Sequence, residues 1–181
     1  MPKKRAKQRK VNNLYLTFKF VSLFLALSLF AYLVLSLTNI PNLVAAYTSQ
    51  LALKVFFNLN SALILNGQFP LIQTPNLLAQ IVDLCSGKIE LAVMFGIIFA
   101  SFEKRMGYRV KGFLLGVLVM LAFNAIRIAT TIYYFDVGAL EWTAALHDFL
   151  FRMFLIIVIV TYYAIWYYYD LPRKASKRSS T

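Results

Sequence analysis

Apolar residues gather in long runs along the chain, and polar residues are concentrated between these runs. The apolar runs cover about residues 18–38, 87–103, 112–135 and 144–169. A helix needs about 20 predominantly apolar residues to cross the roughly 30 Å hydrocarbon core of a bilayer. The pattern therefore predicts about four transmembrane helices, of which the second is short.

The region 41–82 has a different pattern. Its first part favours a helix, but polar residues such as Gln50 and Lys54 interrupt the apolar positions, which is typical of an amphipathic helix lying in the membrane interface. Two apolar runs then flank the pair Asn66-Gly67, which is a strong signal for a β-hairpin. A hairpin with open edges cannot lie in hydrocarbon. We therefore expect this region at or above the membrane surface.

The composition points to the same class of protein. Hydrophobic residues make up 60% of the chain, whereas ordinary soluble domains contain about 45–50% apolar residues. We expect an all-α integral membrane protein with about four transmembrane helices, an interfacial helix and a small extracytoplasmic β-hairpin. The chain has one cysteine and one histidine, which excludes an internal disulfide framework and a cysteine-based metal cage. No metal or organic cofactor is expected.

Basic residues are concentrated at the two ends of the chain and in one loop. Lys and Arg fall mainly in residues 1–13, 103–111 and 172–181, outside the apolar runs. This distribution indicates membrane topology rather than nucleic-acid binding, because basic loops stay in the cytoplasm. We expect residues 14–171 to form a single transmembrane domain between two basic cytoplasmic tails, the first of them disordered by repulsion of like charges. Residues 41–82 then lie on the extracytoplasmic side.

Cys85 is the single cysteine, and it lies just before the second apolar run in the sequence Cys85-Ser86-Gly87-Lys88. On the predicted topology it lies at the extracytoplasmic mouth of a helix. A helix N-terminus favours a thiolate and lowers the pKa of a thiol, and Lys88 adds a positive charge on the same face. A lone cysteine in a membrane protein can equally be one more small apolar residue, so its role depends on other parts of the chain.

Two arginines and the single histidine lie within the outer halves of the later apolar runs. Arg127 lies about eight residues before the outer end of the third run, or ~12 Å along a helix, where charged residues normally face a partner or a polar cavity. Asn124, one turn away, could anchor it. His147 lies at the outer start of the fourth run, with Arg152 at a depth similar to that of Arg127.

Each of these residues also has a structural interpretation. His147 can be a capped interfacial residue, Arg127 can extend to the lipid headgroups, and Arg152 can pair with Asp148 at i and i+4. Together, however, they match what a cysteine nucleophile requires: a group that favours the thiolate, a group that transfers a proton and a donor for the developing oxyanion. Cys85, His147 and an arginine can supply all three.

The order of these motifs resembles the exosortase/archaeosortase family of membrane-embedded cysteine transpeptidases. The matching segments are Cys85-Ser86-Gly87 at the outer start of a span, Asn124-x-x-Arg127-Ile128 in the next span, and His147 at the outer start of the last. The resemblance covers about residues 60–155. Many members have about eight spans, so this chain resembles a minimal core of the family.

The resemblance implies a function and a set of roles. Cys85 matches the nucleophile, Arg127 the essential arginine, and His147 a third position that some members fill with arginine. Ser86, Gly87, Asn124 and Arg152 would support the site. The implied substrates are secreted proteins that end in a short motif, a transmembrane helix and a basic tail. The enzyme would cut this sorting signal on the extracytoplasmic side of the plasma membrane and in some cases pass the new C-terminus to a lipid.

A function of another class is also compatible with the sequence. In a non-enzymatic membrane assembly or accessory protein, the same polar residues would only tie the spans together. The rate and pH dependence of Cys85 alkylation distinguish the two hypotheses, because an activated thiol reacts fast at a shifted pH.

Overall fold

The structure, a computed structural model, describes residues 2–65, 67, 69–138 and 140–169. Within these ranges it describes the side chains from residue 14 onward, except those of residues 140–152 and 154. The predicted basic tail at 172–181 lies outside the described residues.

The described residues form five helices and one small antiparallel sheet. In chain order the elements are α1 (Pro2–Ser36), α2 (Ile40–Phe57), β1 (Ala62–Ile64), β2 (Leu71–Gln73), β3 (Leu78–Gln80), α3 (Lys88–Ala100), α4 (Met106–Asp136) and α5 (Leu140–Tyr169). The chain is thus mostly helical, as predicted.

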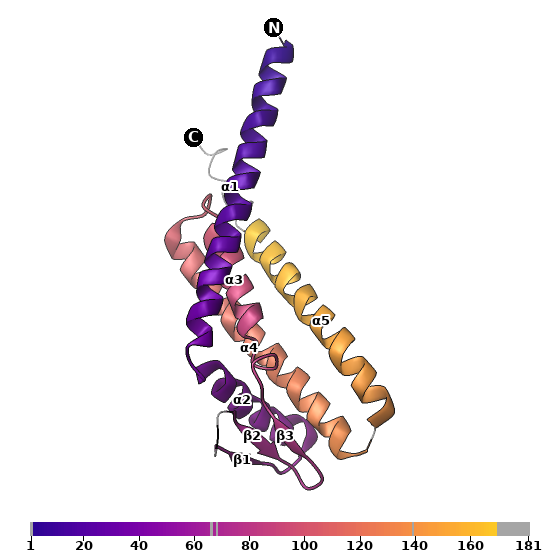
Figure 1. The fold of residues 1–181 in the computed structure, drawn as a ribbon. Coiled ribbons are helices and arrows are strands. Elements are labelled where there is room, and N and C mark those ends of the chain that lie inside the picture. Colours follow the sequence, from indigo (N-terminus) through magenta and orange to yellow (C-terminus); the bar gives the residue numbers. More distant parts are fainter. Residues whose placement is uncertain (1, 66, 68, 139, 170–181) are drawn as a thin grey trace, which may run out of the picture.

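The long helices run side by side, and the sheet and α2 lie together at one end of them (Figure 1). Helix α1 packs along α3, while α4 contacts α2, α3 and α5. One buried cluster joins α2 and the sheet to the C-terminal half of α4, and a second joins α3, α4 and α5. The segment just before α3 lies between these two cores.

Helix α3 is shorter than the predicted span at 87–103. Its 13 residues correspond to about 20 Å at 1.5 Å per residue, which is less than the roughly 30 Å of hydrocarbon. Arg109 contributes to its end. The guanidinium of Arg109 donates a hydrogen bond to the carbonyl of Phe99 in the last turn of α3 (3.0 Å) and another to the carbonyl of Lys104 in the loop that follows (2.8 Å). The first bond satisfies one of the carbonyls that have no partner within a helix C-terminus.

Two other helix starts also differ from prediction. Helix α1 begins at Pro2, so its backbone includes the residues expected to form a disordered tail at 1–13. The tail contains Lys, Arg, Ala and Gln, which are strong helix formers, and it continues directly into an apolar helix. Helix α4 begins at Met106, so most of the predicted loop at 103–111 belongs to its first turns.

The sheet has one strand more than the predicted hairpin. Strands β1 and β2 pair antiparallel on either side of the Asn66-Gly67 connection, and β3 then pairs with β2, so that Ile72 lies opposite both Leu63 and Ala79. The second turn is closed by Thr74, whose backbone N–H and hydroxyl both donate to the carbonyl of Leu77 (2.9 and 3.0 Å). The third strand has only three residues, too few to show an alternating pattern in the sequence.

Asp136 attaches the sheet to the end of α4. Its carboxylate accepts hydrogen bonds from the Thr74 hydroxyl (2.6 Å) and the Asn76 backbone N–H (3.0 Å). Its carbonyl accepts a third from the Asn76 side chain (3.2 Å). Asp136 is buried, so these bonds replace the water that a carboxylate would otherwise need. The sheet is thereby fixed over one end of the helix bundle.

Helix α2 has most of its large apolar residues on the outside. Tyr47, Leu51 and Val55 follow one another at intervals of four and are exposed, whereas the buried face carries mainly small or polar residues such as Ala46 and Ser49, with Leu53 as its large apolar residue. The helices of soluble domains show the opposite arrangement. An exposed stripe of this kind indicates a partner surface that is apolar.

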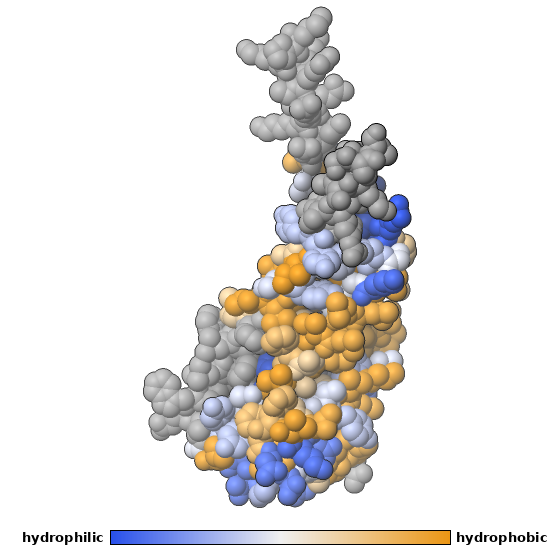
Figure 2. Space-filling model, turned by 180° about the vertical axis from the view of Figure 1, so that it is seen from behind, coloured by the Kyte–Doolittle hydropathy of each residue, from blue (hydrophilic) through white to orange (hydrophobic). Residues whose placement is uncertain are grey.

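Among the residues that the structure describes, two helices are long and apolar enough to cross a membrane, namely the segment Leu14–Ser36 of α1 and helix α4. The segment Leu155–Tyr169 of α5 is apolar but shorter. Figure 2 shows a broad hydrophobic band over the middle of one face, with hydrophilic residues gathered beyond it at both ends. These features are compatible with a membrane protein.

We predict that Gly96→Ala lowers stability. A Cβ atom at Gly96 would overlap the side chain of Ser28 and lie 2.8 Å from the backbone oxygen of Phe24, so α1 and α3 would have to separate. Overpacking of this kind typically costs about 1–3 kcal/mol. The measurement is the midpoint of thermal denaturation in detergent micelles. Gly107→Ala is the control, because a Cβ there meets nothing within 4 Å; equal midpoints for the two variants would contradict the prediction.

Candidate functional site

The segment that carries Cys85 is a tight turn leading into α3. The Cys85 N–H donates to the carbonyl of Val82 (2.9 Å), and both the N–H and the hydroxyl of Ser86 donate to the carbonyl of Asp83 (3.3 and 2.7 Å). Ser86 and Gly87 are buried, whereas Cys85 is partly exposed. The turn therefore leaves the thiol residue accessible while its neighbours pack inward.

Gly87 ends this turn with a backbone conformation that other residues rarely adopt. Its φ of 75° lies in the left-handed region, which glycine adopts without the steric cost of a Cβ atom. Its carbonyl then accepts the N–H of Leu91 (2.9 Å), which is the first turn of α3. Cys85 lies three residues before Lys88, where the helix begins, so it precedes the first helical turn rather than forming part of it.

Two side chains of α4 hold the turn from the other side. Asn124 Nδ2 donates to the backbone carbonyl of Cys85 at 3.0 Å, and Arg127 Nη2 donates to the same oxygen at 3.3 Å. Asn124 is buried and Arg127 is partly buried. The structure thus brings together the predicted residues Cys85, Asn124 and Arg127. Asn124 and Arg127 follow Cys85 in the chain by 39 and 42 positions. Asn124 contacts the cysteine turn directly, a contact that the sequence did not predict.

A second polar contact fixes the start of the turn. Lys88 Nζ lies 2.6 Å from Asp83 Oδ1, and Asn42 Nδ2 from α2 donates to the same oxygen at 2.9 Å. The hydrogen bonds from Lys88 and Asn42 hold the pKa of Asp83 below its ordinary value. The ammonium of Lys88 therefore pairs with a carboxylate, whereas the sequence suggested that its charge would act on the thiol.

Asp83, Lys88 and Asn42 were not predicted as site residues. Lys88 is almost completely buried, with 2% of its side chain exposed, whereas 55% of the Asp83 side chain is exposed. The spacing of Asp83 and Lys88 around Cys85 was visible in the sequence. Nothing in the sequence connects Asn42 with Asp83, because they are 41 positions apart and belong to different elements.

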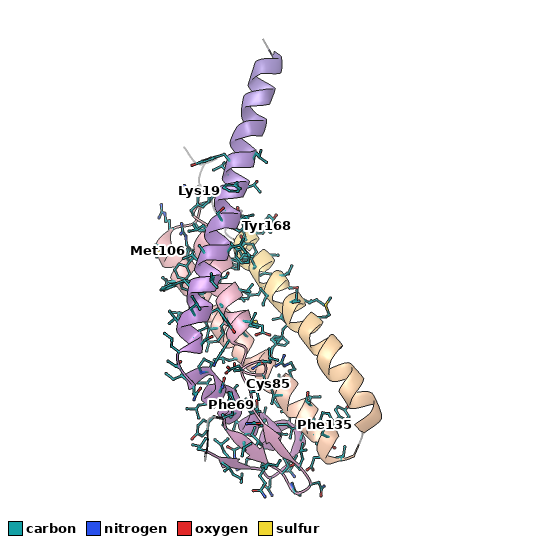
Figure 3. The ribbon with its side chains drawn as sticks, in the orientation of Figure 1. Lys19, Phe69, Cys85, Met106, Phe135 and Tyr168 are labelled. Carbon is teal, nitrogen blue, oxygen red and sulfur yellow. The ribbon has the colours of Figure 1, made fainter. Side chains whose placement is uncertain are left out.

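His147 and Arg152 belong to α5, but their side chains lie outside the described residues. The proximity of His147 to Cys85 remains a prediction. Figure 3 shows Cys85 near the start of α3, alongside α4. Within the described part of the chain, no group of three His, Cys, Asp or Glu side chains could hold a metal ion.

No protein-family model, curated protein or solved structure matches the chain. The chemistry of the site therefore has to be inferred from its own residues. These are a cysteine thiol outside any disulfide on a tight turn, a guanidinium and an amide that bind the backbone of that turn, and a carboxylate–ammonium pair beside it. Such a set can position a nucleophile and stabilise negative charge beside it.

We predict that Asp83→Asn is more destabilising than Lys88→Met. Removing the carboxylate leaves a buried ammonium without its ionic partner, which costs about 3–5 kcal/mol for fully buried pairs and less here because Asp83 is exposed to solvent. Removing the ammonium leaves the carboxylate at the surface, where water solvates it. The measurement is the midpoint of thermal denaturation of each variant in detergent micelles.

The pH dependence of the same variants provides a control. Because folding lowers the pKa of Asp83, its contribution to stability is complete above the unfolded-state value of about 3.9 and is lost as the pH falls through the folded-state value. The difference between the native protein and Asp83→Asn should therefore shrink below about pH 3.9. A difference that stays constant down to lower pH would show that the ion pair is not its cause.

Proposed function

We propose that the chain is a multi-pass membrane cysteine protease or transpeptidase that resembles the exosortase/archaeosortase family. Its activity would be to cleave a C-terminal sorting signal of secreted proteins. The observation that carries this proposal is the pair of hydrogen bonds from Asn124 and Arg127 to the carbonyl of Cys85. They join the Cys-Ser-Gly turn to the Asn-x-x-Arg helix, two segments that the resemblance matches separately.

The proposed topology has four spans, formed by α1, α3, α4 and α5, with both termini in the cytoplasm. Helix α3 alone is short, but non-helical backbone is tolerated at membrane depth where it is buried in protein. Ser86 and Gly87 before α3 and Ser101 and Lys104 after it are all buried. Helix α2 would lie in the outer interface with its exposed apolar stripe toward lipid, and the sheet would lie outside the membrane. This places Cys85 on the extracytoplasmic side of the plasma membrane.

The proposed reaction begins with attack of the Cys85 thiolate on a peptide carbonyl carbon of the substrate. A bond forms between Sγ and carbon, and the electron pair of the C=O bond moves to the oxygen. When the tetrahedral intermediate collapses, the C–N bond breaks and the amine leaves with a proton from His147. A thioester remains on Cys85. An amine, a lipid headgroup or water then attacks the thioester carbonyl and gives its proton to His147. The C–S bond breaks, and the Cys85 thiolate is released.

Arg127 would have two tasks in this reaction. Its Nη2 contact with the Cys85 carbonyl keeps the guanidinium beside the turn, and the planar group has five N–H donors in total. Donors of this kind can bind the thiolate before attack and the oxyanion after it. Asn124, Ser86 and Gly87 would hold the turn in place, and Arg152 would support the site from α5.

The proposed substrates are secreted proteins that end in a short motif, a transmembrane helix and a basic tail. The tail of such a substrate lies in the cytoplasm, its helix lies beside the spans of the enzyme, and its motif reaches the outer surface near Cys85. The acceptor for the new C-terminus would be a membrane lipid, another amine or water.

We predict that Cys85→Ser abolishes processing without loss of membrane insertion, because it removes the thiolate and changes the volume little. His147→Ala should slow processing by about 10²–10⁴-fold, the usual effect of losing one proton-transfer group. The double variant should be no worse than Cys85→Ser alone, since residues of one catalytic unit are not additive. The measurement is uncleaved substrate in cells with matched membrane levels of each variant. Normal processing by Cys85→Ser would end the proposal.

A membrane assembly or accessory protein is the second candidate, and one observation favours it. The described contacts of Asn124 and Arg127 with the turn reach a backbone carbonyl, which is also what two purely structural residues would do. The charged residues described around the turn are Asp83, Lys88, Glu90 and Arg127, and a structural role for all of them would leave Cys85 with ordinary thiol chemistry.

Alkylation of Cys85 separates the two candidates without a known substrate. Cys85 is the only cysteine of the chain, so a membrane-impermeant thiol reagent added from outside reports on it alone. An enzyme should show fast labelling with a midpoint well below the ordinary thiol pKa of about 8.5. Arg127→Ala and Arg127→Lys should both move the midpoint upward, because lysine lacks the planar fork. Slow labelling with an ordinary profile, unchanged in both variants, would favour the assembly protein.

A further inference from the structure

A pocket lies at the end of the bundle opposite Cys85, between α1, the end of α3 and α5. Its volume is about 280 Å³. Its lining includes four aromatic side chains and one carboxylate, contributed by Phe20, Phe102, Tyr163, Tyr167 and Glu103. Figure 3 places Lys19 and Tyr168 at this end of the molecule and Cys85 farther along the helices. On the proposed topology this end is at the level of the cytoplasmic headgroups.

The walls of the pocket are held by hydrogen bonds. The hydroxyls of Ser101 and Tyr163 are 2.9 Å apart, and the Tyr167 hydroxyl donates to Glu103 Oε2 at 2.6 Å. Lys104 Nζ donates to the backbone carbonyl of Tyr167 at 2.8 Å. Ser101 and Lys104 are both buried. The tyrosine rings and the carboxylate therefore have fixed positions around the space between them.

These residues can bind an ammonium group. The faces of aromatic rings attract cations, and among the described lining residues Glu103 is the single charged one. Two rings already attract ammonium groups of the chain itself, since Lys19 Nζ lies 5.1 Å from the Phe102 ring centre and Lys104 Nζ lies 4.8 Å from that of Tyr167. A ligand ammonium would meet the same ring chemistry together with a carboxylate.

The charge around the pocket also favours an anion in the ligand. The ammonium groups of Lys19 and Lys104 lie over two rings of the pocket, those of Phe102 and Tyr167, so the pocket has two positive charges and one carboxylate around it. A ligand with a phosphate next to its ammonium satisfies both conditions, because the phosphate can approach exposed Lys19 while the ammonium approaches Glu103. Leu16 lines the pocket and is exposed, and Val21 and Leu25 farther along α1 are exposed and apolar, so acyl chains can lie against this helix.

We propose that this pocket binds the phosphoethanolamine headgroup of a membrane phospholipid. The ammonium lies among the aromatic rings beside Glu103, the phosphate faces Lys19, and the acyl chains follow the apolar surface of α1. The site is separate from Cys85 and does not depend on the proposed enzymatic activity. It fixes the cytoplasmic end of the bundle at the headgroup level.

The test uses the full chain reconstituted in vesicles of equal parts phosphatidylethanolamine and phosphatidylglycerol. After gentle detergent extraction, the lipids that stay with the protein are counted by native mass spectrometry. The native protein should retain phosphatidylethanolamine over phosphatidylglycerol. Glu103→Gln should reduce this preference at least about threefold, a modest value for a cation held by rings and a carboxylate. Equal retention of the two lipids by the native protein would overturn the proposal.

Matched variants separate binding from misfolding. Glu90→Gln makes the same change at the other end of α3 and should keep the native preference. Phe20→Leu removes one ring but keeps an apolar side chain, so it should weaken the preference even if Glu103→Gln proves unstable. Native lipid preference in both Phe20→Leu and Glu103→Gln would overturn the proposal.

Competition with soluble phosphoethanolamine provides a further test, because the same headgroup chemistry could come from a free metabolite. We expect the soluble compound to displace the retained lipid only at high concentrations, since the acyl chains of the lipid add apolar contacts. Tight binding of soluble phosphoethanolamine that depends on Glu103, without any preference among vesicle lipids, would overturn a lipid site in favour of a soluble ligand.

Discussion

The contact between α4 and the carbonyl of Cys85 is the constraint on which the arrangement of the site depends. A turn between a surface sheet and a buried helix has backbone groups that no regular element satisfies. Asn124 and Arg127 supply two donors to one of these groups, and they are one helical turn apart on α4. The position of the thiol residue is therefore set by two residues of α4 that follow it in the chain by 39 and 42 positions.

Helix α4 fixes both ends of α3 in this way. Near its start Arg109 donates to the carbonyl of Phe99 at the end of α3 and to that of Lys104 in the following loop. Farther along, Asn124 and Arg127 donate to the turn before α3. Arg109 and Arg127 are 18 residues apart, or about 27 Å along a helix. The segment of α4 between Arg109 and Arg127 thus spans α3 and its flanking turns. Hydrogen bonds from α4 hold this short apolar helix at both ends.

The sequence predicted the structural features whose signal lies within a single helix or strand. It missed the features that depend on contacts between two elements. The apolar runs located α1, α4 and α5, and the spacing of Asn124 and Arg127 placed both on one face. The sequence predicted that the second span is short, but it placed the end at residue 103 rather than at Ala100, because this end depends on Arg109, a residue that seemed to belong to a loop. Asn42 was missed for the same reason: its contact with Asp83 exists only after α2 packs against the turn. Hydrophobic periodicity reports on burial, but it does not report which polar groups meet.

The attachment of the sheet to Asp136 has a consequence for how the chain is made. Thr74 and Asn76 precede their partner by 62 and 60 residues, and at a synthesis rate of about 5–20 residues per second the partner appears roughly 3–12 s later. During that interval the small sheet lacks the helix end that anchors it. The sheet can therefore reach its final position only after the end of α4 has been synthesised.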